Sequence, residues 1–596
     1  MVIRRVALGI VGCLLAVILT AASCGKAPAV SPTTTSPTTQ TATTPSSTTP
    51  STASTQLPTT TAKDVPTYGG MVNFIQGGEY LARWDPTAGS HEPLTLIYEH
   101  LLYYDWYKSM KDWGSEYAYG PQSVLTGWLA ESWEMPDAST FRFHIRQGVH
   151  WQNKAPANGR ELVADDIKYS LEWYTSSPLV SVGADWKLID SITTGPDKYT
   201  ITFHTKTPQT PEFIYNFMGS GGGVLTFCPD PIKVYGPKAY QDWKLACGTG
   251  PFMVTDYVAG SSATYKRNPD YWEFDKNYPE NRLPYVSTVR CLVIPDTATR
   301  LTALRTGKLT WVMGVTWSQA ETFRKTNPEL KYRRVLGMPG LCAMNVKQLP
   351  FTDVRVRQAM NMAIDYKAII DGYYKGNAEI AYLTWPLHRS LGEMALTYDE
   401  LSQTIKDQFE YHPDKARELL AAAGYPGGFK TSVDLVATDL AAVDIFSVVQ
   451  SDLAAINVKL ELKIDEAGAF ASLKYGHTYT QMLVPTSGGP TWQGGPRADL
   501  STWYTPGIYD YPDYSEQAYL DRLAAAKMIM NDADRTKAYK ELAKYVLEQA
   551  LYVLIPAPYN YTYWQPWVKG YSGQYGMFYS DYNMFKHWWV DPSHQE

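Results

Sequence analysis

The sequence lacks the linear motifs on which most catalytic and metal centres are built. Its ten His residues are scattered, with no His-x-His and no HExxH, and no Cys-x-x-Cys occurs, so a metal site of standard ligand spacing is not expected. A GxSxG turn, a Walker loop and a GxGxxG after a strand are also absent. Gly221–Gly223 is rich in glycine, but no Lys-Ser or Lys-Thr pair follows it, which favours a loop over a phosphate cradle. We therefore expect no catalytic residue, no metal and no cofactor.

An excess of charge of one sign is also missing. The net charge is only −6, so we expect no nucleic-acid partner. With 596 residues and 44% apolar residues, the chain predicts two or three packed units of an ordinary globular kind. Aromatic residues are abundant at 13%, with 44 Tyr and 19 Trp. Most belong in cores, but such side chains also suit walls that hold polar organic ligands.

Long apolar runs are absent except at the N-terminus. Arg4 and Arg5 precede the apolar stretch Val6–Ala22, and Ser23 and Cys24 follow it. A basic start, an apolar centre and small residues before a cleavage point are typical of an export signal, here residues 1–23. A Cys directly after that point resembles the lipobox of bacterial lipoproteins, in which Cys24 would carry the lipids. An uncleaved membrane helix is the alternative, but the run is short for a span.

The segment that follows has too few apolar residues to fold. Residues 24–66 consist mainly of Thr, Ser, Pro and Ala after the lipidated Cys, so we expect a disordered stalk. Lipids at its base would hold the globular body at the membrane. The predicted location is thus the extracytoplasmic face of the cell membrane, in the periplasm or at the cell surface.

Four cysteines remain after the predicted anchor, and they permit three full pairings. Cys228 and Cys247 are the closest pair and have loop-like surroundings, so they are the candidate disulfide. Cys291 and Cys342 lie in apolar, strand-like runs and are expected to be small buried residues.

The globular part alternates predicted strands and helices. Period-two alternation predicts strands over Thr140–Arg146, Tyr199–His204 and Asn457–Ile464. Helices are predicted over Glu92–Tyr103, from Asp296 to Gly307, from Asp353 onward, and from Pro413 to Gly424. Helices between such strands indicate α/β architecture, with mixed sheets covered by helices.

Seven segments resemble, in the same order, motifs of the family 5 extracellular solute-binding proteins, which serve peptide- and nickel-type ABC importers. They are LAESWEMPDASTFRFHIRQGVHW (Leu129–Trp151), ELVADDIKYSLE (Glu161–Glu172), GTGPF (Gly248–Phe252), YKRNPDYW (Tyr265–Trp272), TRLTALRTGK (Thr299–Lys308), PFTDVRVRQAMNMAID (Pro350–Asp365) and PDKARELLAAAGYPGGF (Pro413–Phe429). The similarity extends from about Tyr68 to the C-terminus. Val163 replaces the Thr that usually caps the helix of the second segment.

The resemblance implies a two-lobed periplasmic-binding-protein fold of type II, the Venus-flytrap fold. Lobe I would comprise residues 67–337 and the return segment 558–596, and lobe II residues 338–557. The chain would cross near Gly337–Leu341 and return near Pro556–Asn560. The implied function is capture of a peptide or a similar small polar solute by hinge closure, as a monomer that delivers to ABC permease subunits.

The residues expected to contact the ligand in lobe II lie in Ser487–Tyr504. In peptide-binding relatives a Trp-x-x-Asp segment supplies the carboxylate for the peptide amine. Here Trp492 is kept, but the first acid is Asp499, displaced so that it is better interpreted as a helix cap. A buried ammonium needs a carboxylate, so the glycines Gly488 and Gly489 could instead bind a neutral ligand on which Trp492 and Trp503 stack. Core packing is an equal alternative for both Trp residues.

In lobe I the corresponding candidates come from three separate stretches of sequence. They are Ser90, His91, Thr249, Tyr559 and Asn560. A helix-start role is the alternative for His91. The aromatic insertion Tyr103–Tyr119 has no counterpart in the family; it is either a lip over the cleft or a surface packed on the lobe.

Three alternative functions remain at this point. A carrier of saccharides or other neutral polar solutes would use the same fold. An extracellular hydrolase would assemble its site in space, and turnover of a bound ligand would reveal it. A sensory receptor subunit would be encoded beside a sensor kinase instead of a permease.

Overall fold

The computed structural model describes the larger of two units of the chain, Asp64–Glu596. The described residues are 65–77, 81, 84–86, 92–108, 124–176, 187–217, 225–337, 339–380, 395–485, 495–507, 509–574 and 582–594. Within these ranges, no helix is both long and apolar enough to cross a membrane. The export signal, Cys24 and the stalk lie outside the described residues and stay predictions.

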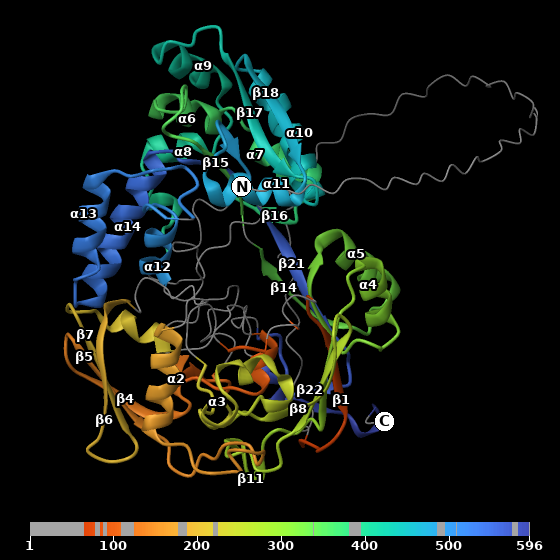
Figure 1. Cartoon of the computed structure of the whole chain (residues 1–596). Coiled ribbons are helices and arrows are strands. Elements are labelled where there is room, and N and C mark those ends of the chain that lie inside the picture. Colours follow the sequence, from red (N-terminus) through yellow and green to blue (C-terminus); the bar gives the residue numbers. More distant parts are fainter. Residues whose placement is uncertain are drawn as a thin grey trace, which may run out of the picture. The chain divides into compact units, whose positions relative to one another are not determined.

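Lobe I contains two four-stranded sheets (Figure 1). The first has the order β1-β12-β9-β8, in which only β1 and β12 are parallel. The second is antiparallel, with the order β4-β5-β7-β6, and helix α2 (Ala164–Ser176) contacts β6 and β7. The strands are β1 (Met71–Ile75), β4 (Ala130–Asp137), β5 (Thr140–Ile145), β6 (Ile189–Thr194), β7 (Thr200–Thr205), β8 (Phe252–Val258), β9 (Ser262–Arg267) and β12 (Thr288–Leu292).

Alternating side chains direct the second sheet onto the core. Phe141 pairs with Phe203 and Phe143 with Ile201 across β5 and β7, and all four are buried. Because the side-chain period of a strand is two, the intervening polar residues face the other side. The core of lobe I continues from these residues to the C-terminal segment, including Phe585 and Trp588.

A third sheet joins segments far apart in sequence. β21 (Ala557–Trp564) lies between β13 (Trp311–Thr316) and β14 (Lys331–Leu336), antiparallel to both. α4 (Thr297–Arg305) and α5 (Trp317–Thr326) contribute Leu304, Ala320 and Phe323 to its separate core. β21 therefore completes a sheet that begins about 250 residues earlier, as the pairing of Trp564 with Trp311 and Lys331 shows.

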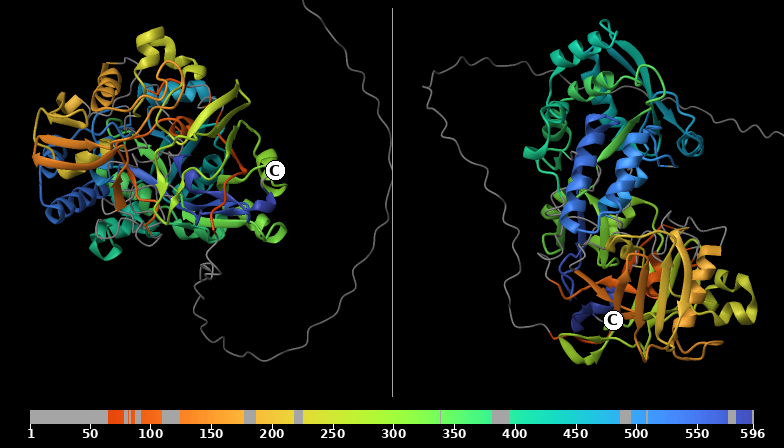
Figure 2. Two further views of the ribbon diagram at one scale, coloured as in Figure 1. Left: turned by 90° about the horizontal axis from the view of Figure 1, so that it is seen from below. Right: turned by 90° about the vertical axis from the view of Figure 1, so that its left-hand side faces the viewer.

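Lobe II has a five-stranded mixed sheet of order β18-β17-β19-β15-β20. β17 (Phe429–Val436) is parallel to β18 (Val458–Asp465), as expected for strands joined through a helix. In Figure 1, α6, α9 and α10 surround this end of the sheet, and Figure 2 shows α13 and α14 side by side in shades of blue. The remaining strands and the helices are β15 (Gly340–Met344), β19 (Met482–Leu483), β20 (Tyr552–Ile555), α6 (Val354–Met362), α9 (Pro413–Ala422), α10 (Leu440–Ala454), α11 (Ala467–Gly476), α13 (Gln517–Ala526) and α14 (Asp532–Glu548).

The shorter strands form the two-stranded sheets β2-β3, β10-β11 and β22-β23, except β16, which pairs with β21 of the third sheet. These strands and the shorter helices are β2 (Leu102–Tyr104), β3 (Leu125–Gly127), β10 (Phe274–Asp275), β11 (Tyr278–Arg282), β16 (Ala378–Glu379), β22 (Val568–Lys569), β23 (Trp589–Val590), α3 (Asp230–Tyr235), α7 (Tyr366–Ala368), α8 (Gln403–Gln408) and α12 (Gly495–Thr502).

Most predicted elements are confirmed with small changes at their ends. Asp296 and Asp353 cap α4 and α6, accepting hydrogen bonds from the N–H groups of Thr299 and Arg355. Gly424 follows α9 with φ of 93°, the left-handed geometry that a helix C-terminus favours. Cys291 and Cys342 are fully buried in β12 and β15.

The predicted helix Glu92–Tyr103 is wrong. The segment forms a 3-10 helix only over Glu92–Leu96, and its end enters strand β2. All residues from 93 to 104 are buried, so the apolar residues at helical spacing did not mark one face of a helix. Pairing of Leu102 with Gly127 of β3 fixes the extended geometry instead.

Candidate functional site

Lobe I presents a buried carboxylate toward lobe II just after β7. The 3-10 helix Pro211–Phe217 carries Glu212 in its first turn. Only 6% of Glu212 is exposed, so its charge needs partners. Gln209 and Phe213 lie beside it in sequence and are also buried.

The partners of Glu212 come from α14 of lobe II. The Tyr539 hydroxyl donates a hydrogen bond to Glu212 Oε2 at 3.0 Å, and Arg535 Nε lies 3.3 Å from the same oxygen. Arg535 and Tyr539 are four residues apart, so they share one face of the helix. Arg535 is held in turn by Asp532 at 2.6 Å and by the carbonyl oxygen of Ile529 at 2.8 Å.

A second contact between the lobes begins in α12. Arg497 Nη2 donates a hydrogen bond to Gln209 Oε1 at 3.1 Å, and the guanidinium lies 5.9 Å from the centre of the Phe213 ring. Both Arg497 and Gln209 are 5% exposed. We call Gln209, Glu212, Arg497, Arg535 and Tyr539 the inter-lobe cluster.

The electrostatics of the inter-lobe cluster suit adhesion between lobes. Burial raises the pKa of the Glu212 carboxyl, while the positive charge of Arg535, the Tyr539 hydroxyl and the charge of Arg497 oppose that rise. An ion pair removed from water is weakly stabilising as a whole, but losing one partner leaves an uncompensated charge. The inter-lobe cluster is therefore sensitive to any movement that separates α14 from the segment that carries Glu212.

The sequence did not reveal the inter-lobe cluster. An Arg and a Tyr spaced by four residues on a helix match any amphipathic surface, and nothing in the local sequence links them to Glu212, 327 positions away from Tyr539. Arg497 lies within Ser487–Tyr504, the segment expected to contact the ligand, but the sequence predicted no role for it.

Thr249 lies in the GTGPF turn, where the structure explains the glycines. Thr249 is fully buried. Burial raises the pKa of the Glu99 carboxyl, and the Thr249 side chain is among the groups that oppose this rise. A Cβ added to Gly248 would lie 2.0 Å from the Ile97 carbonyl oxygen, and one added to Gly250 would lie 2.5 Å from it. The turn is thus packed directly against the backbone of another segment, and its motif serves this close approach.

Tyr559 and Asn560 lie in β21, next to the chain crossing. The Tyr559 hydroxyl donates a hydrogen bond to Glu379, and the Arg334 guanidinium lies 4.0 Å from the ring centre. Asn560 pairs with Thr316 and Val335 of the flanking strands. Tyr559 therefore contacts Glu379 of lobe II as well as Arg334 of lobe I, whereas Asn560 pairs with strands of lobe I.

The structure places Trp503 in the core of lobe II. It is 2% exposed, its ring lies 5.7 Å from that of Tyr511, and its carbonyl oxygen accepts a hydrogen bond from Tyr552 at 3.2 Å. The interpretation of Asp499 as a helix cap is wrong, because α12 begins at Gly495 and Asp499 lies inside it.

The other predicted ligand contacts fall outside the described residues. They are Ser90, His91, Gly488, Gly489 and Trp492. The side chain of Asp499 is likewise outside the description.

One group of potential metal ligands occurs among the described residues. Asp407, Glu410 and His412 offer donor atoms within 4.8 Å of one another. Each already has a partner, because Lys415 pairs with Asp407 and His412 lies 3.1 Å from Glu410. Such acidic clusters are common on surfaces, and nothing else marks this one as a metal site.

The candidate disulfide partners are neighbours, although the structure holds them as free thiols. The Cys228 N–H donates a hydrogen bond to the Cys247 carbonyl oxygen at 3.3 Å, and the two thiols interact. Burial raises the pKa of the Cys228 thiol, which keeps it protonated in the folded state and slows its reaction. The bridge stays a prediction.

We expect Cys228 and Cys247 to be joined in protein exported to an oxidising compartment. The two thiols would lose two protons and two electrons to a thiol oxidant of that compartment, before folding buries them. Mass spectrometry of denatured, unreduced protein should show two alkylated cysteines, Cys291 and Cys342, and a peptide linking positions 228 and 247. Alkylation of all four positions without reduction would contradict the bridge. Such a bridge stabilises by roughly 3 kcal/mol for a loop of this size.

A protein-family model matches most of the globular part of the chain. The model described as bacterial extracellular solute-binding proteins, family 5 Middle, matches residues 124–511. Di/tripeptide-binding protein 1 of Pseudomonas aeruginosa is 28% identical over 490 residues, which cover 76% of this chain and 84% of the relative. Heme-binding protein A of Haemophilus influenzae is 26% identical over 481 residues, which cover 74% of this chain and 81% of the relative.

Solved structures share the fold. The periplasmic binding protein DppA of Helicobacter pylori, in complex with the peptide STSA, has a TM-score of 0.67 and 24% identity over 88% of this chain and 99% of its own. NikA of Brucella suis, in complex with Fe(III)-EDTA, has a TM-score of 0.70 and 19% identity over 87% of this chain and 100% of its own. The two-lobed α/β fold implied by the sequence motifs is therefore confirmed.

Proposed function

Since this chain belongs to the family 5 bacterial extracellular solute-binding proteins, we propose that it captures peptides, or a similar small polar solute, for an ABC importer. The ligand is enclosed between two lobes and no bond is broken. The observation that carries this proposal is the buried contact between Glu212 of lobe I and Arg535 of lobe II. In a protein that closes on its ligand, such a contact forms only in the closed state.

The hinge lies where two sheets meet. Leu336 of β14 pairs with Tyr559 of β21, while Gly340 of β15 pairs with Ile555 of β20. Gly337 on the first crossing and Pro556 on the return fall between these pairs, which supports a boundary between residues 337 and 338 and another near residue 557. At the first crossing, a Cβ on Gly337 would lie 2.6 Å from the Asn560 side chain, so the glycine allows the two strands to cross closely.

The proposed setting is the outer face of the cell membrane. Cys24 follows the apolar segment at the position of a lipidated residue, and residues 24–66 form a tether. The chain acts as a monomer and presents its closed form to the permease subunits.

Peptide is the first choice of ligand for two reasons. One relative is the di/tripeptide-binding protein 1 of Pseudomonas aeruginosa, and the structure of Helicobacter pylori DppA contains the peptide STSA. A neutral solute such as a saccharide is the second choice. It is favoured by the missing carboxylate of the Trp-x-x-Asp segment, since Gly495 begins α12 where an acid would stand.

Native mass spectrometry of the full chain, purified gently from membranes in mild detergent, tests the proposal. We expect a bound mass that is lost after unfolding and refolding, because lobe closure slows release. A series of masses separated by residue-sized steps would establish peptides. Hexose-sized steps would replace peptides with saccharides. A ligand that is converted to product during incubation would overturn transport in favour of hydrolysis.

A further inference from the structure

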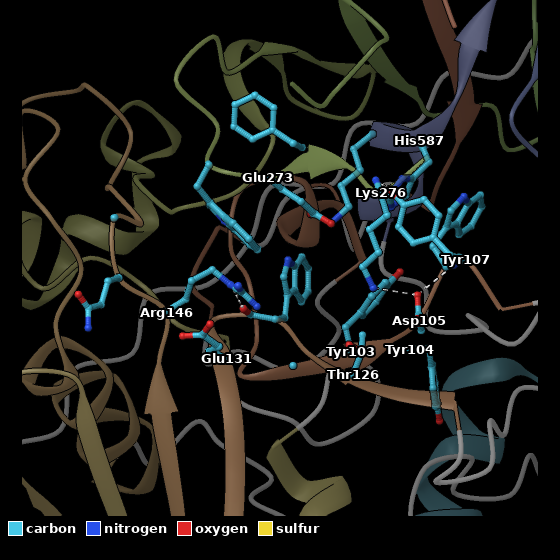
Figure 3. Close-up of a pocket in the computed structure, with 18 residues that line it drawn as sticks. Tyr103, Tyr104, Asp105, Tyr107, Thr126, Glu131, Arg146, Glu273, Lys276 and His587 are labelled. Atoms are coloured by element: carbon cyan, nitrogen blue, oxygen red, sulfur yellow. Dashed lines mark hydrogen bonds and ion pairs between the residues drawn. The ribbon is translucent and has the colours of Figure 1, made fainter. Parts of the chain in front are cut away.

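Lobe I has a cavity of its own, of about 540 Å³, shown in Figure 3. Its walls are Tyr103, Tyr104, Asp105, Trp106, Tyr107, Thr126, Gly127, Trp128, Glu131, Arg146, Gln147, Gly148, Trp272, Glu273, Phe274, Lys276, Lys586 and His587. None of these residues comes from lobe II, so the cavity is formed without closure of the lobes. Its volume lies in the range of small-molecule sites.

Aromatic side chains form much of the cavity wall. Trp106 stacks on His587, with ring centres 5.0 Å apart and planes 6° apart, and Tyr107 meets the same imidazole edge-on at 5.4 Å. Across the cavity the Arg146 guanidinium lies 5.0 Å from the centre of the Trp272 ring. Tyr107 and Trp272 are only half-buried, so part of each ring remains available to a ligand.

The charges of the wall cancel. Three basic residues, Arg146, Lys276 and Lys586, stand against three acidic ones, Asp105, Glu131 and Glu273. Lys276 lies 3.3 Å from Asp105 and Lys586 lies 2.5 Å from Glu273. A charged ligand would have to break these pairs, whereas hydroxyl groups can share their remaining donors and acceptors.

The wall also contains a buried imidazole, that of His587. His587 is 3% exposed, and its Nδ1 has no hydrogen-bond partner among the described residues. Burial and the nearby Lys586 and Lys276 hold the pKa of His587 well below its usual value, so the imidazole is neutral. The imidazole therefore adds no charge to the wall, and the three basic and three acidic residues stay in balance.

We propose that this cavity is a second binding site, for a neutral pyranose sugar, independent of the inter-lobe cleft. The apolar face of a pyranose packs on the exposed parts of Tyr107 and Trp272. Its hydroxyls hydrogen-bond to the paired charges around Lys276 and Lys586. In Figure 3, Asp105, Tyr107 and Lys276 lie on one side of the cavity and Arg146 and Glu131 on the other.

Calorimetric titration of the full chain tests the second site, with glucose, galactose, maltose and cellobiose as probes. We expect saturable binding of at least one of them, weakened tenfold or more by Tyr107→Ala. Tyr235→Ala is the matched control, because Tyr235 is 56% exposed on α3 and lies outside the cavity; it should leave binding unchanged. If Tyr107→Ala fails to fold, Lys276→Ala, at a side chain that is 55% exposed, should produce the same loss.

Arg535→Met distinguishes this site from the cleft. Sugar binding to the cavity should survive Arg535→Met, because Arg535 and its contacts with Glu212, Asp532 and Ile529 lie outside the cavity. Binding that is abolished by Arg535→Met but unaffected by Tyr107→Ala would place the sugar in the cleft and overturn the second site. Absence of binding by all four sugars would overturn it as well, while leaving peptide capture in the cleft untouched.

Discussion

Replacing Arg535 with Met should shift the protein strongly toward its open form. Arg535 is 4% exposed and lies 3.3 Å from the buried Glu212 carboxylate of the other lobe. Without Arg535, closure of the lobes would bury the Glu212 carboxylate and leave it without the guanidinium that pairs with it. Removing one partner of a buried pair costs about 3–5 kcal/mol, and the lower end applies because Arg497 also acts on Glu212. The ratio of closed to open molecules should then fall roughly a hundredfold.

Small-angle scattering and retention of the co-purified ligand measure this shift. The Arg535→Met variant should have a larger radius of gyration than the unaltered protein and should lose its bound ligand during purification. Asp532→Asn is the matched control, since Asp532 contacts the same guanidinium but is 70% exposed, and exposed pairs contribute little. The double variant Glu212→Gln with Arg535→Met removes both charges and should recover part of the closure. An unchanged radius and undiminished retention in Arg535→Met would show that Glu212 and Arg535 do not stabilise the closed form.

Replacing Gly248 with Ala should destabilise lobe I by about 3 kcal/mol or more, the upper end of the cost of overpacking. The added Cβ would lie 2.0 Å from the Ile97 carbonyl oxygen and 2.9 Å from the Tyr98 ring. A backbone carbonyl cannot move aside as a flexible side chain can, and Gly250 N–H donates a hydrogen bond to the same oxygen at 2.8 Å. The clash therefore displaces the turn as well as the 3-10 segment it packs against.

Thermal and urea unfolding, with yield of soluble protein, measure the loss. Gly427→Ala is the matched control, because no atom lies within 4 Å of its added Cβ. It should leave the unfolding temperature unchanged or slightly raised, through the lower entropy of the unfolded chain. Equal unfolding temperatures for the two variants would mean that the turn tolerates a side chain and that its glycines are not required by packing.

The interior of a regular element was predictable where one face is buried. The alternation in Thr140–Arg146 and Asn457–Ile464 became β5 and β18, because a strand half exposed to water has a period of two. The prediction failed between residues 92 and 103, where every residue from Pro93 onward is buried. A fully buried segment has no polar face, so its apolar residues match helix and strand equally well.

The sequence by itself determined the family, the two-lobed fold and the buried positions of Cys291 and Cys342. These depend on local order, on motifs such as GTGPF and on runs of apolar residues, which are properties of contiguous sequence. Only the tertiary structure decided that Glu212 meets Arg535 and Tyr539, and that the Tyr103–Tyr107 segment closes a cavity with Trp272, Lys586 and His587. Such contacts join residues hundreds of positions apart. Their formation depends on how whole sheets and helices pack. No local pattern of the sequence shows which distant residues that packing brings together.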